Sequence, residues 1–471
     1  MNSKEKITNF LNIFKKNYNK TCLIDEFGDI YRYKDVLEKA TLTNNFIKKK
    51  SLVLILASNT PDFITFYFSF LIYGHVQIIV DEKIENTLLE NIIHKYKPNF
   101  FFIPKNKKFV LNSIQKYKTT KNYIIHKNKS KIKHNLNLDL AVLLSTSGTT
   151  GATKFVKLSN YNILNNSKNI SKYLKIKKID RAITTLPLHY SYGLSVINTH
   201  IFSGASIFVT KKNILEKKFW IDFKKYKISN LSGVPYFYEI LKKIKFENFD
   251  LKYLKYLTQA GGALNKKLTI HFINYCKRSN KKFIVMYGQT EATSRISYLD
   301  WKYASKKIGS IGKAIPEGKL ILNKNKKTDS FGELIYYGDN VSMGYSNDFL
   351  DLRKKNSNNG ILKTGDLAKV DKDGFYYIVG RKNRIIKMFG HRISLDDLEK
   401  KIHELNIKCA CIGKDDYINI FYTKKYLKKK IENILTKLFK FKINNFKLNW
   451  IKKIPYSNNG KILYSKLNEK I

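Results

Sequence analysis

The ten residues Ser145–Lys154, "STSGTTGATK", combine glycines, hydroxyl side chains and a single lysine directly after the apolar run "LAVLL". Glycines let the backbone come close to an oxyanion, and Ser/Thr hydroxyls with exposed N–H groups donate hydrogen bonds to it. The stretch lacks the Gly-Lys-Ser/Thr ending of a Walker loop, so its lysine is not placed to open a helix over phosphates. Taken alone, it fits a polar surface loop as well as a phosphate-binding loop.

Four further stretches carry polar side chains and follow in a fixed order. They are "LPLHYSYGL" (186–194), "YGQTEAT" (287–293), "KTGDLAKVDKDGFYYIVGRKNRIIKMFGHRISLDDLE" (363–399) and "PYSNNGKILYSKL" (455–467). With the loop above, the chain resembles the adenylate-forming superfamily, which comprises acyl- and aryl-CoA synthetases, adenylation domains of peptide synthetases, and luciferases. The resemblance covers essentially the whole chain. More weakly, the chain resembles the acyl-CoA-ligase-like members of bacterial surface-polysaccharide gene sets.

The resemblance implies a reaction in two halves. A carboxylate attacks the α-phosphate of ATP and expels pyrophosphate, and a thiol then displaces AMP from the acyl-adenylate. It therefore implies an acid–thiol ligase that uses ATP, Mg²⁺ and a small carboxylic acid, with CoA or the phosphopantetheine arm of a separate, acidic carrier protein as acceptor. The alternatives are an amino-acid-adenylating ligase that loads a carrier protein, an adenylate-only or luciferase-like enzyme, and a non-catalytic binding protein that kept the fold.

The resemblance also assigns the phosphate and metal contacts. The residues that wrap the β- and γ-phosphates are Thr146, Ser147, Gly148, Thr149, Thr150 and Gly151, assisted by Lys154. In "YGQTEAT", Tyr287 stacks on adenine and Thr290 touches the α-phosphate, with Gly288 and Gln289 between them. Glu291 holds Mg²⁺, a hard cation that takes oxygen ligands and neutralises the departing pyrophosphate.

Further residues follow by resemblance for the base, the ribose and the acyl group. Gly261, Gly262 and Ala263 form a small-residue turn beside adenine and the acyl pocket, Asp366 accepts the ribose hydroxyls, and Arg381 is the second ribose contact. His189 swings near the acyl carboxylate. The position where amino-acid-activating members carry an aspartate aligns with Gly193. Because a buried ammonium without a carboxylate is costly, this favours a fatty, hydroxy or aryl acid.

The C-terminal stretches supply the mobile parts of the predicted mechanism. Lys461 matches the family's mobile lysine, whose ammonium stabilises the charge that develops at the α-phosphorus. The hinge falls at Lys382 and Asn383, where the family usually has aspartate or lysine at the pivot. Asparagine tolerates unusual backbone angles, so the pivot can still turn. After rotation, a tunnel for the pantetheine thiol is lined by Gly390, His391 and Arg392.

The surrounding sequence predicts an α/β fold. Apolar runs such as "SLVLILAS", "VQIIVD", "NFFFIP" and "FIVMYG" alternate with helical spacing, which is typical of mainly parallel sheets covered on both faces. Hairpin signals after about residue 332 predict a small β-barrel-like part. We expect an N-terminal AMP-binding domain over 1–382 and a small, mobile α+β lid domain over 383–471.

Composition limits the other function classes. The net charge is +51, but it comes mostly from dispersed lysines without an arginine-rich tract, so we expect no nucleic-acid binding. The most apolar window, 63–80, is split by Gly74 and His75 and predicts a buried helix and a buried strand, hence no membrane insertion. Four scattered cysteines predict buried thiols, and with no signal peptide in the N-terminal residues they fit the cytoplasm.

Overall fold

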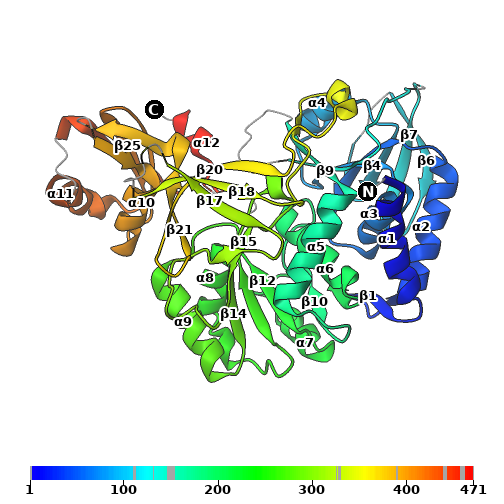
Figure 1. Cartoon of the computed structure of the whole chain (residues 1–471), viewed down its shortest axis with the longest axis horizontal. Helices are drawn as coiled ribbons and strands as arrows, with labels where there is room; N and C mark the ends of the chain where they lie inside the picture. The colour runs from blue at the N-terminus through cyan, green and yellow to red at the C-terminus, as the bar shows by residue number, and fades with distance from the viewer. Residues whose placement is uncertain are drawn as a thin grey trace.

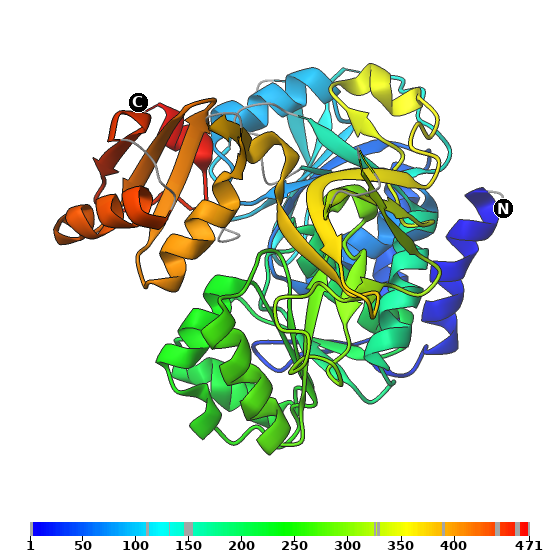
Figure 2. The same ribbon diagram turned by 60° about the vertical axis from the view of Figure 1, so that its left-hand side comes forward.

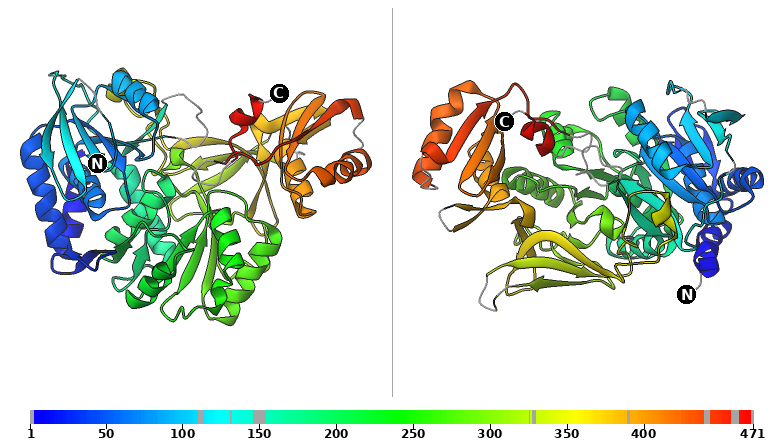
Figure 3. Two further views of the ribbon diagram at one scale, coloured as in Figure 1. Left: turned by 180° about the vertical axis from the view of Figure 1, so that it is seen from behind. Right: turned by 90° about the horizontal axis from the view of Figure 1, so that it is seen from above.

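The structure is a computed structural model that describes residues 3–109, 113–130, 132–145, 154–324, 326, 330–388, 391–438, 443–456 and 462–469. A large α/β body carries a smaller C-terminal part at one side (Figures 1 and 2). The two views of Figure 3 show the same division from behind and from above. The predicted α/β class is confirmed, although the sheets are mixed rather than purely parallel.

An eight-stranded sheet forms the N-terminal half of the body. Its centre is parallel and is made of β8 (Leu140–Ser145), β4 (Val76–Asp81), β3 (Leu52–Ala57) and β5 (Phe100–Pro104). Its antiparallel edges are β9 (Phe155–Ser159) and β19 (Tyr345–Ser346) on one side, and β7 (Tyr123–Asn128) and β6 (Ile114–Thr119) on the other. The central strands are buried on both faces, which explains their continuous apolar sequences.

Helices cover both faces of this sheet. One face packs against α1 (Ser3–Lys16), α2 (Tyr33–Ile47), α3 (Pro61–Tyr73), α5 (Asn160–Leu174) and α6 (Ser191–Phe202), and the other face packs against α4 (Asn86–Tyr96). Helix α3 is apolar nearly all round because it is buried nearly all round. The Thr60 hydroxyl caps its N-terminus, and Gly74, at φ 76°, ends it before β4. The predicted helix and strand in 63–80 are confirmed.

Two further sheets complete the α/β body. One has the order β10 (Arg181–Ile183), β11 (Ser206–Val209), β1 (Thr21–Asp25), β2 (Ile30–Arg32). The other has the order β12 (Asn230–Gly233), β13 (Tyr256–Gln259), β14 (Lys282–Tyr287), β15 (Ser297–Leu299), β16 (Lys313–Ala314). Helices α7 (Lys217–Lys225), α8 (Pro235–Lys243) and α9 (Lys266–Arg278) accompany them. In the second sheet β12, β13 and β14 run parallel, so their carboxyl ends share one edge.

An antiparallel sheet leads to the C-terminal part. Its order is β17 (Lys319–Asn323), β18 (Gly332–Tyr337), β20 (Ile361–Val370), β21 (Tyr376–Arg381), and the predicted turn between β20 and β21 is confirmed. Beyond it lie the hairpin β22 (Ile385–Met388) and β23 (His391–Ser394), and the sheet β24 (Cys409–Lys414), β25 (Tyr417–Tyr422), β26 (Phe446–Trp450). Helices α10 (Leu395–Glu404), α11 (Lys428–Leu438) and α12 (Tyr464–Asn468) pack on this last sheet. The two buried apolar clusters of the C-terminal part contain only residues from Ile386 onward.

Two predictions from composition can be compared with the structure. All four cysteines are buried free thiols, as expected. Within the described ranges, the helices are either too short or too polar to cross a bilayer.

Candidate active site

The first group of predicted residues gathers around one buried carboxylate, that of Asp366 on β20. Tyr287, at the end of β14, donates its hydroxyl hydrogen bond to Asp366 Oδ2, and Gln289 Nε2 donates to the same oxygen at 2.9 Å. Arg381 on β21 lies opposite Asp366 in the antiparallel register, with Nε 3.4 Å from Oδ1. Burial, followed by the charge of Asp366, raises the pKa of Tyr287 well above its usual range, so the phenol stays a donor. Three residues, from two separated strands and a loop, thus surround the one carboxylate of Asp366.

The second group links the predicted metal ligand to the predicted phosphate lysine. Tyr345 on β19 donates its hydroxyl hydrogen bond to Glu291 Oε1 at 3.0 Å. The Lys154 ammonium lies over the face of the same tyrosine ring, 3.6 Å from its centroid. Burial raises the pKa of the Tyr345 phenol, with a further contribution from the Glu291 charge. A cation and a carboxylate, 137 positions apart in the chain, are therefore held on either side of one aromatic ring.

The loop "YGQTEAT" has a backbone that only particular residues allow. A Cβ on Gly288 would lie 1.8 Å from the Ser294 carbonyl oxygen, so this position requires glycine. Thr293 has φ 63°, an unusual angle for a β-branched residue, and its hydroxyl donates to the Asn340 carbonyl at 2.7 Å. The buried Asn340 amide in turn donates to the carbonyls of Ala292 and Arg295 at 2.8 and 2.9 Å. Asn340 therefore holds the loop that presents Thr290 and Glu291.

The stretch 186–194 reaches this loop through its hydroxyls. Ser191 Oγ, at the start of α6, lies 3.3 Å from Thr290 Oγ1. Two residues earlier, His189 Nε2 lies 3.8 Å from Asp81 Oδ2 at the end of β4. Burial lowers the pKa of His189, and the charges of Asp81 and Glu82 only partly offset that effect. His189 is therefore a neutral imidazole at pH 7, able to donate or accept one hydrogen bond.

The small-residue turn after β13 lies against this same stretch. Gly261 has φ 82°, and a Cβ there would meet the Tyr190 hydroxyl at 2.6 Å and Val234 at 3.1 Å. The neighbouring Gly262 carbonyl accepts from Gln259 Nε2 at 2.7 Å. Glycine at 261 is thus required both by the backbone angle and by the closeness of Tyr190. Ala263 follows on the exposed side of the turn.

Gly193 has a different explanation from the one that the sequence suggested. A Cβ at this position would lie 2.2 Å from the Pro187 carbonyl oxygen, inside the protein. No larger side chain fits without moving that backbone, so glycine here is a packing requirement. The packing accounts for the glycine, and the inference from the missing aspartate to an acid without an ammonium group stays a prediction.

Residues next to the predicted pivot contact both the preceding sheet, through β18, and the C-terminal part, through α10. Lys382 Nζ forms an ion pair with Glu333 Oε2 on β18 at 2.9 Å. The Arg381 backbone N–H donates to Asp396 Oδ2 at 3.0 Å, and Asp396 also pairs with Arg384. Asn383 lies between them in a single 3₁₀ turn, Lys382–Arg384.

Several predicted residues cannot be placed with the others. Thr146, Ser147, Gly148, Thr149, Thr150, Gly151, Gly390 and Lys461 lie outside the described residues. The backbone of His391 and Arg392 belongs to β23, where they pair with Met388 and Lys387, but their side chains are also outside the description. The ends of the segment that carries Lys461 are joined by a bridge between Tyr456 and Ile462.

Glu291 meets the chemical requirement for a magnesium ligand. Its carboxylate is only partly buried, and within the described part of the chain Oε1 accepts a side-chain hydrogen bond from the Tyr345 hydroxyl. No group of three or more His, Cys, Asp or Glu residues is assembled for a metal among the described residues. This fits Mg²⁺, which is usually held by one or two carboxylates together with substrate phosphates and water.

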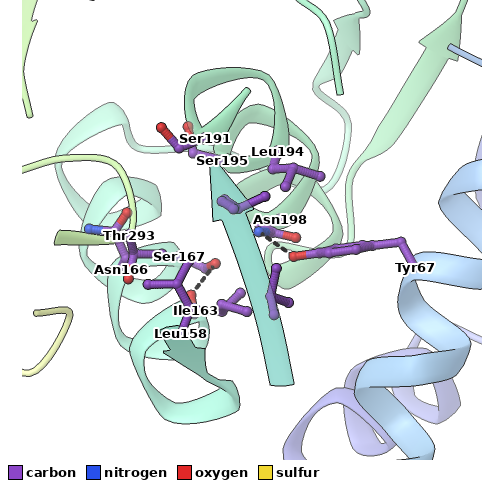
Figure 4. Close-up of a pocket in the computed structure, with 12 residues that line it drawn as sticks. Tyr67, Leu158, Ile163, Asn166, Ser167, Ser191, Leu194, Ser195, Asn198 and Thr293 are labelled. Carbon is purple, nitrogen blue, oxygen red and sulfur yellow. Dashed lines mark hydrogen bonds between the residues drawn. The ribbon is translucent and has the colours of Figure 1, made fainter. Parts of the chain in front are cut away.

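A small enclosed cavity lies behind this site, between α3, α5, α6 and the central strands (Figure 4). Its lining includes Ser191 and Thr293, and Figure 4 shows the Tyr67 hydroxyl bonded to Asn198 on its far side. The side-chain oxygens of Asn166 and Asn198 are buried without a hydrogen-bond partner. The cavity has room for about one water molecule, which these oxygens would bind, so it is not a substrate pocket.

Sequence analysis missed three residues of the site. Tyr345 and Asn340 lie in no motif, and only the paired strands bring them to Glu291 and its loop. Arg295 lies four residues after Glu291 in "ATSRISYL", where it is the single charged residue, and this was a usable signal. It is 3% exposed.

The fold and the site define a nucleotide-binding α/β protein in which four separated segments meet at strand ends. A family model described as "AMP-binding enzyme" matches residues 12–346, and the chain belongs to this family. The resemblance to the adenylate-forming superfamily is thereby confirmed.

Individual relatives show the same relationship. The chain is 28% identical over 344 residues to oxalate–CoA ligase from Saccharomyces cerevisiae, covering 69% of this chain and 62% of the ligase. It is 26% identical over 343 residues to 2-succinylbenzoate–CoA ligase from Listeria innocua, covering 70% of each. The alignment spans less than two-thirds of the yeast ligase's length.

The fold is also that of a solved structure, o-succinylbenzoate–coenzyme A synthetase from Bacillus subtilis in complex with ATP and magnesium ion. The two share 18% sequence identity with a TM-score of 0.78, over 98% of this chain and 99% of the other. At this identity the likeness establishes the fold alone.

Proposed function

We propose that this chain activates a carboxylic acid with ATP to an acyl-adenylate and then transfers the acyl group to the thiol of CoA. The observation that carries this proposal is the convergence of Tyr287, Gln289 and Arg381 on the buried carboxylate of Asp366. A carboxylate oriented by neighbouring donors on both of its oxygens suits the paired hydroxyls of a ribose. The family match and the names of the relatives, both CoA ligases, support the same activity.

The residues have distinct tasks in the proposed reaction. Asp366 and Arg381 orient the ribose, and Tyr287 lies against the base. Lys154 and the loop 146–151 bind the outer phosphates. Mg²⁺, held through Glu291, supplies charge neutralisation for the departing pyrophosphate. Lys461 neutralises the repulsion between the attacking carboxylate and the α-phosphate, and the neutral His189 lies beside the acyl carboxylate.

We also propose the division into an AMP-binding domain, 1–382, and a lid domain, 383–471, that turns about Asn383. The separate apolar clusters beyond Ile386 support this division. In the described pose, rotation requires the Arg381 N–H to release Asp396. Rotation would then bring Gly390, His391 and Arg392 towards the pantetheine arm.

The proposal extends to the identity of the thiol acceptor and to the class of acid. CoA is preferred because the named relatives are CoA ligases, and an acidic carrier protein is the second candidate because of the +51 charge. Oxalate and 2-succinylbenzoate, the acids in the relatives' names, carry no amino group, so an acid without an ammonium is favoured here too.

The test is carboxylate-dependent ATP–pyrophosphate exchange with a panel of fatty, hydroxy, aryl, dicarboxylic and amino acids. Exchange with one class establishes adenylate formation and identifies the acid. A second assay with CoA and with carrier proteins then identifies the thiol. Absence of exchange with every class, from protein that binds ATP, would contradict the proposed activity.

A further inference from the structure

Arg295 is a buried cation next to the proposed acyl site. It follows the loop "YGQTEAT" directly and is 3% exposed. Its guanidinium lies over the face of Tyr192 on α6, 3.8 Å from the ring centroid. Its Nε donates to Met286 Sδ at 3.4 Å, and one terminal nitrogen donates to Ser294 Oγ at 2.5 Å. Arginine keeps its charge inside proteins, so this is a full positive charge away from solvent.

No negative charge in the described part of the chain balances Arg295. No carboxylate there lies within the 4.0 Å limit of an ion pair with the guanidinium. The contacts are a thioether, which is a weak acceptor, the hydroxyls of Ser294 and Tyr173, and an aromatic face, all of them uncharged. Stacking on Tyr192 offsets part of the desolvation cost but leaves the charge in place.

The surrounding tyrosines do not serve as counter-ions. Burial raises the pKa values of Tyr173 and Tyr192, and it raises the pKa of Tyr190 to about 12. In all three, the positive charge of Arg295 works against that rise without reversing it. These phenols are therefore neutral at pH 7, and the guanidinium lies in a neutral aromatic shell.

This shell borders the proposed acyl pocket. The Tyr190 ring packs edge-on against Tyr192, with centroids 6.3 Å apart, and the Tyr190 hydroxyl touches the Gly261 turn. Tyr190 itself is only partly buried. Access from the Gly261 turn to the guanidinium would require the Tyr190 side chain to rotate.

We infer that the acid activated by this chain carries a second anionic group, and that Arg295 binds that group as its counter-ion. The inference rests on the proposed function and names its substrate class: an acid with a carboxylate or similar oxyanion at the far end of its acyl part. A planar guanidinium offers two parallel N–H donors to such a group. Arg295 is thus a specificity residue, separate from the groups that act on ATP.

The experiment compares diacids with their own monomethyl esters, which keep the reacting carboxylate and remove the second charge. Succinate, glutarate and phthalate are each paired with the ester in ATP–pyrophosphate exchange, using wild type, Arg295→Met, Arg295→Lys and the control Arg278→Met. Arg278 is exposed on α9, outside the site. We expect wild type to prefer at least one diacid over its ester, and Arg295→Met to lose about 100-fold in kcat/KM for that diacid, mainly through KM.

The variants separate recognition from folding and from the chemistry. Arg295→Met should keep its activity on the ester, Arg295→Lys should retain part of the diacid preference, and Arg278→Met should match wild type. Equal use of diacid and ester by wild type, or equal loss of both in folded Arg295→Met, would overturn the inference. Calorimetric titration of the same acids provides an independent readout. Diacid binding that depends on Arg295, without exchange for any acid, would contradict the proposed function and leave this inference standing. Exchange with a monocarboxylic acid together with no diacid binding would refute this inference and leave the proposed function standing.

Discussion

Two arginines in this molecule, the buried Arg295 and the mostly buried Arg384, each stack on a tyrosine ring but have opposite electrostatic surroundings. Arg295 lies 3.8 Å above the Tyr192 ring, and Arg384 lies 3.8 Å above the Tyr464 ring. Arg384 also pairs with two carboxylates, Asp396 and, at 2.7 Å, Glu399. Arg295 pairs with none in the described part of the chain.

The contrast separates a structural cation from one held for a ligand. Arg384 links the segment after the hinge to α10, and Glu399 extends the network by accepting from the Tyr464 hydroxyl at 2.8 Å and the Cys411 N–H at 2.6 Å. Every charge in this network has an internal partner. Around Arg295 the partners are neutral within the described residues, which leaves its charge for an added anionic group to balance.

The largest expected effect is on stability, in a direct comparison of the two arginines. Arg384→Met leaves two carboxylates without their cation, and we expect a loss of about 3–5 kcal/mol in the free energy of unfolding. Arg295→Met removes an unpaired charge, and we expect a change of about 1 kcal/mol or less. Urea unfolding of both variants measures the difference. The double variant Arg384→Met/Glu399→Gln should recover part of the first loss, and similar losses in both single variants would contradict the contrast.

A third cation, Lys461, is predicted to act on the reaction itself. Lys461→Ala should lower ATP–pyrophosphate exchange by about 10²- to 10³-fold, because a charge that stabilises the transition state is lost. Thiol transfer from preformed adenylate should stay near the wild-type rate. Lys466→Ala, an exposed lysine five positions on, is the matched control. Equal loss of both half-reactions would exclude the proposed role.

A substitution at Asp366 should change the KM for ATP and leave the KM for the acid almost unchanged. Asp366→Asn removes the charge that Tyr287, Gln289 and Arg381 surround, and we expect the KM for ATP to rise roughly 10- to 100-fold. The KM for the acid should change little, opposite to the pattern expected for Arg295→Met. Initial-rate kinetics with each substrate varied in turn measure both, with Asp373→Asn in an exposed turn as control. A larger effect on the acid than on ATP would show that the two ends are not separate.

The smallest expected effect concerns His189 and pH. Burial lowers its pKa in the folded protein, so the unfolded chain takes up a proton first as the pH falls. Its contribution to stability is present above the ordinary histidine pKa and is lost as the pH falls through the folded value. His189→Asn should therefore flatten the change in urea midpoint between pH 7.5 and pH 5. An unchanged pH profile would indicate that His189 is exposed to solvent.

Much of the fold followed from local sequence. The runs that became β3, β4, β5, β8 and β14 are continuous apolar blocks because both faces of each strand are covered. The Thr60, Pro61 and Gly74 signals set the ends of α3. The packing reason for glycine at 193, the Pro187 carbonyl oxygen 2.2 Å from where a Cβ would lie, was visible only in the structure.

The sequence by itself determined the family and the order of the nucleotide motifs, since both depend on residue types at short, fixed spacings. The tertiary structure alone decided which charges are paired. Lys154, Glu291 and Tyr345 meet only because β19 pairs with β9 and the loop after β14 folds beside them. Whether a carboxylate neutralises a buried arginine depends on which side chains long-range packing brings within about 4 Å of it, and a local sequence pattern does not contain that information.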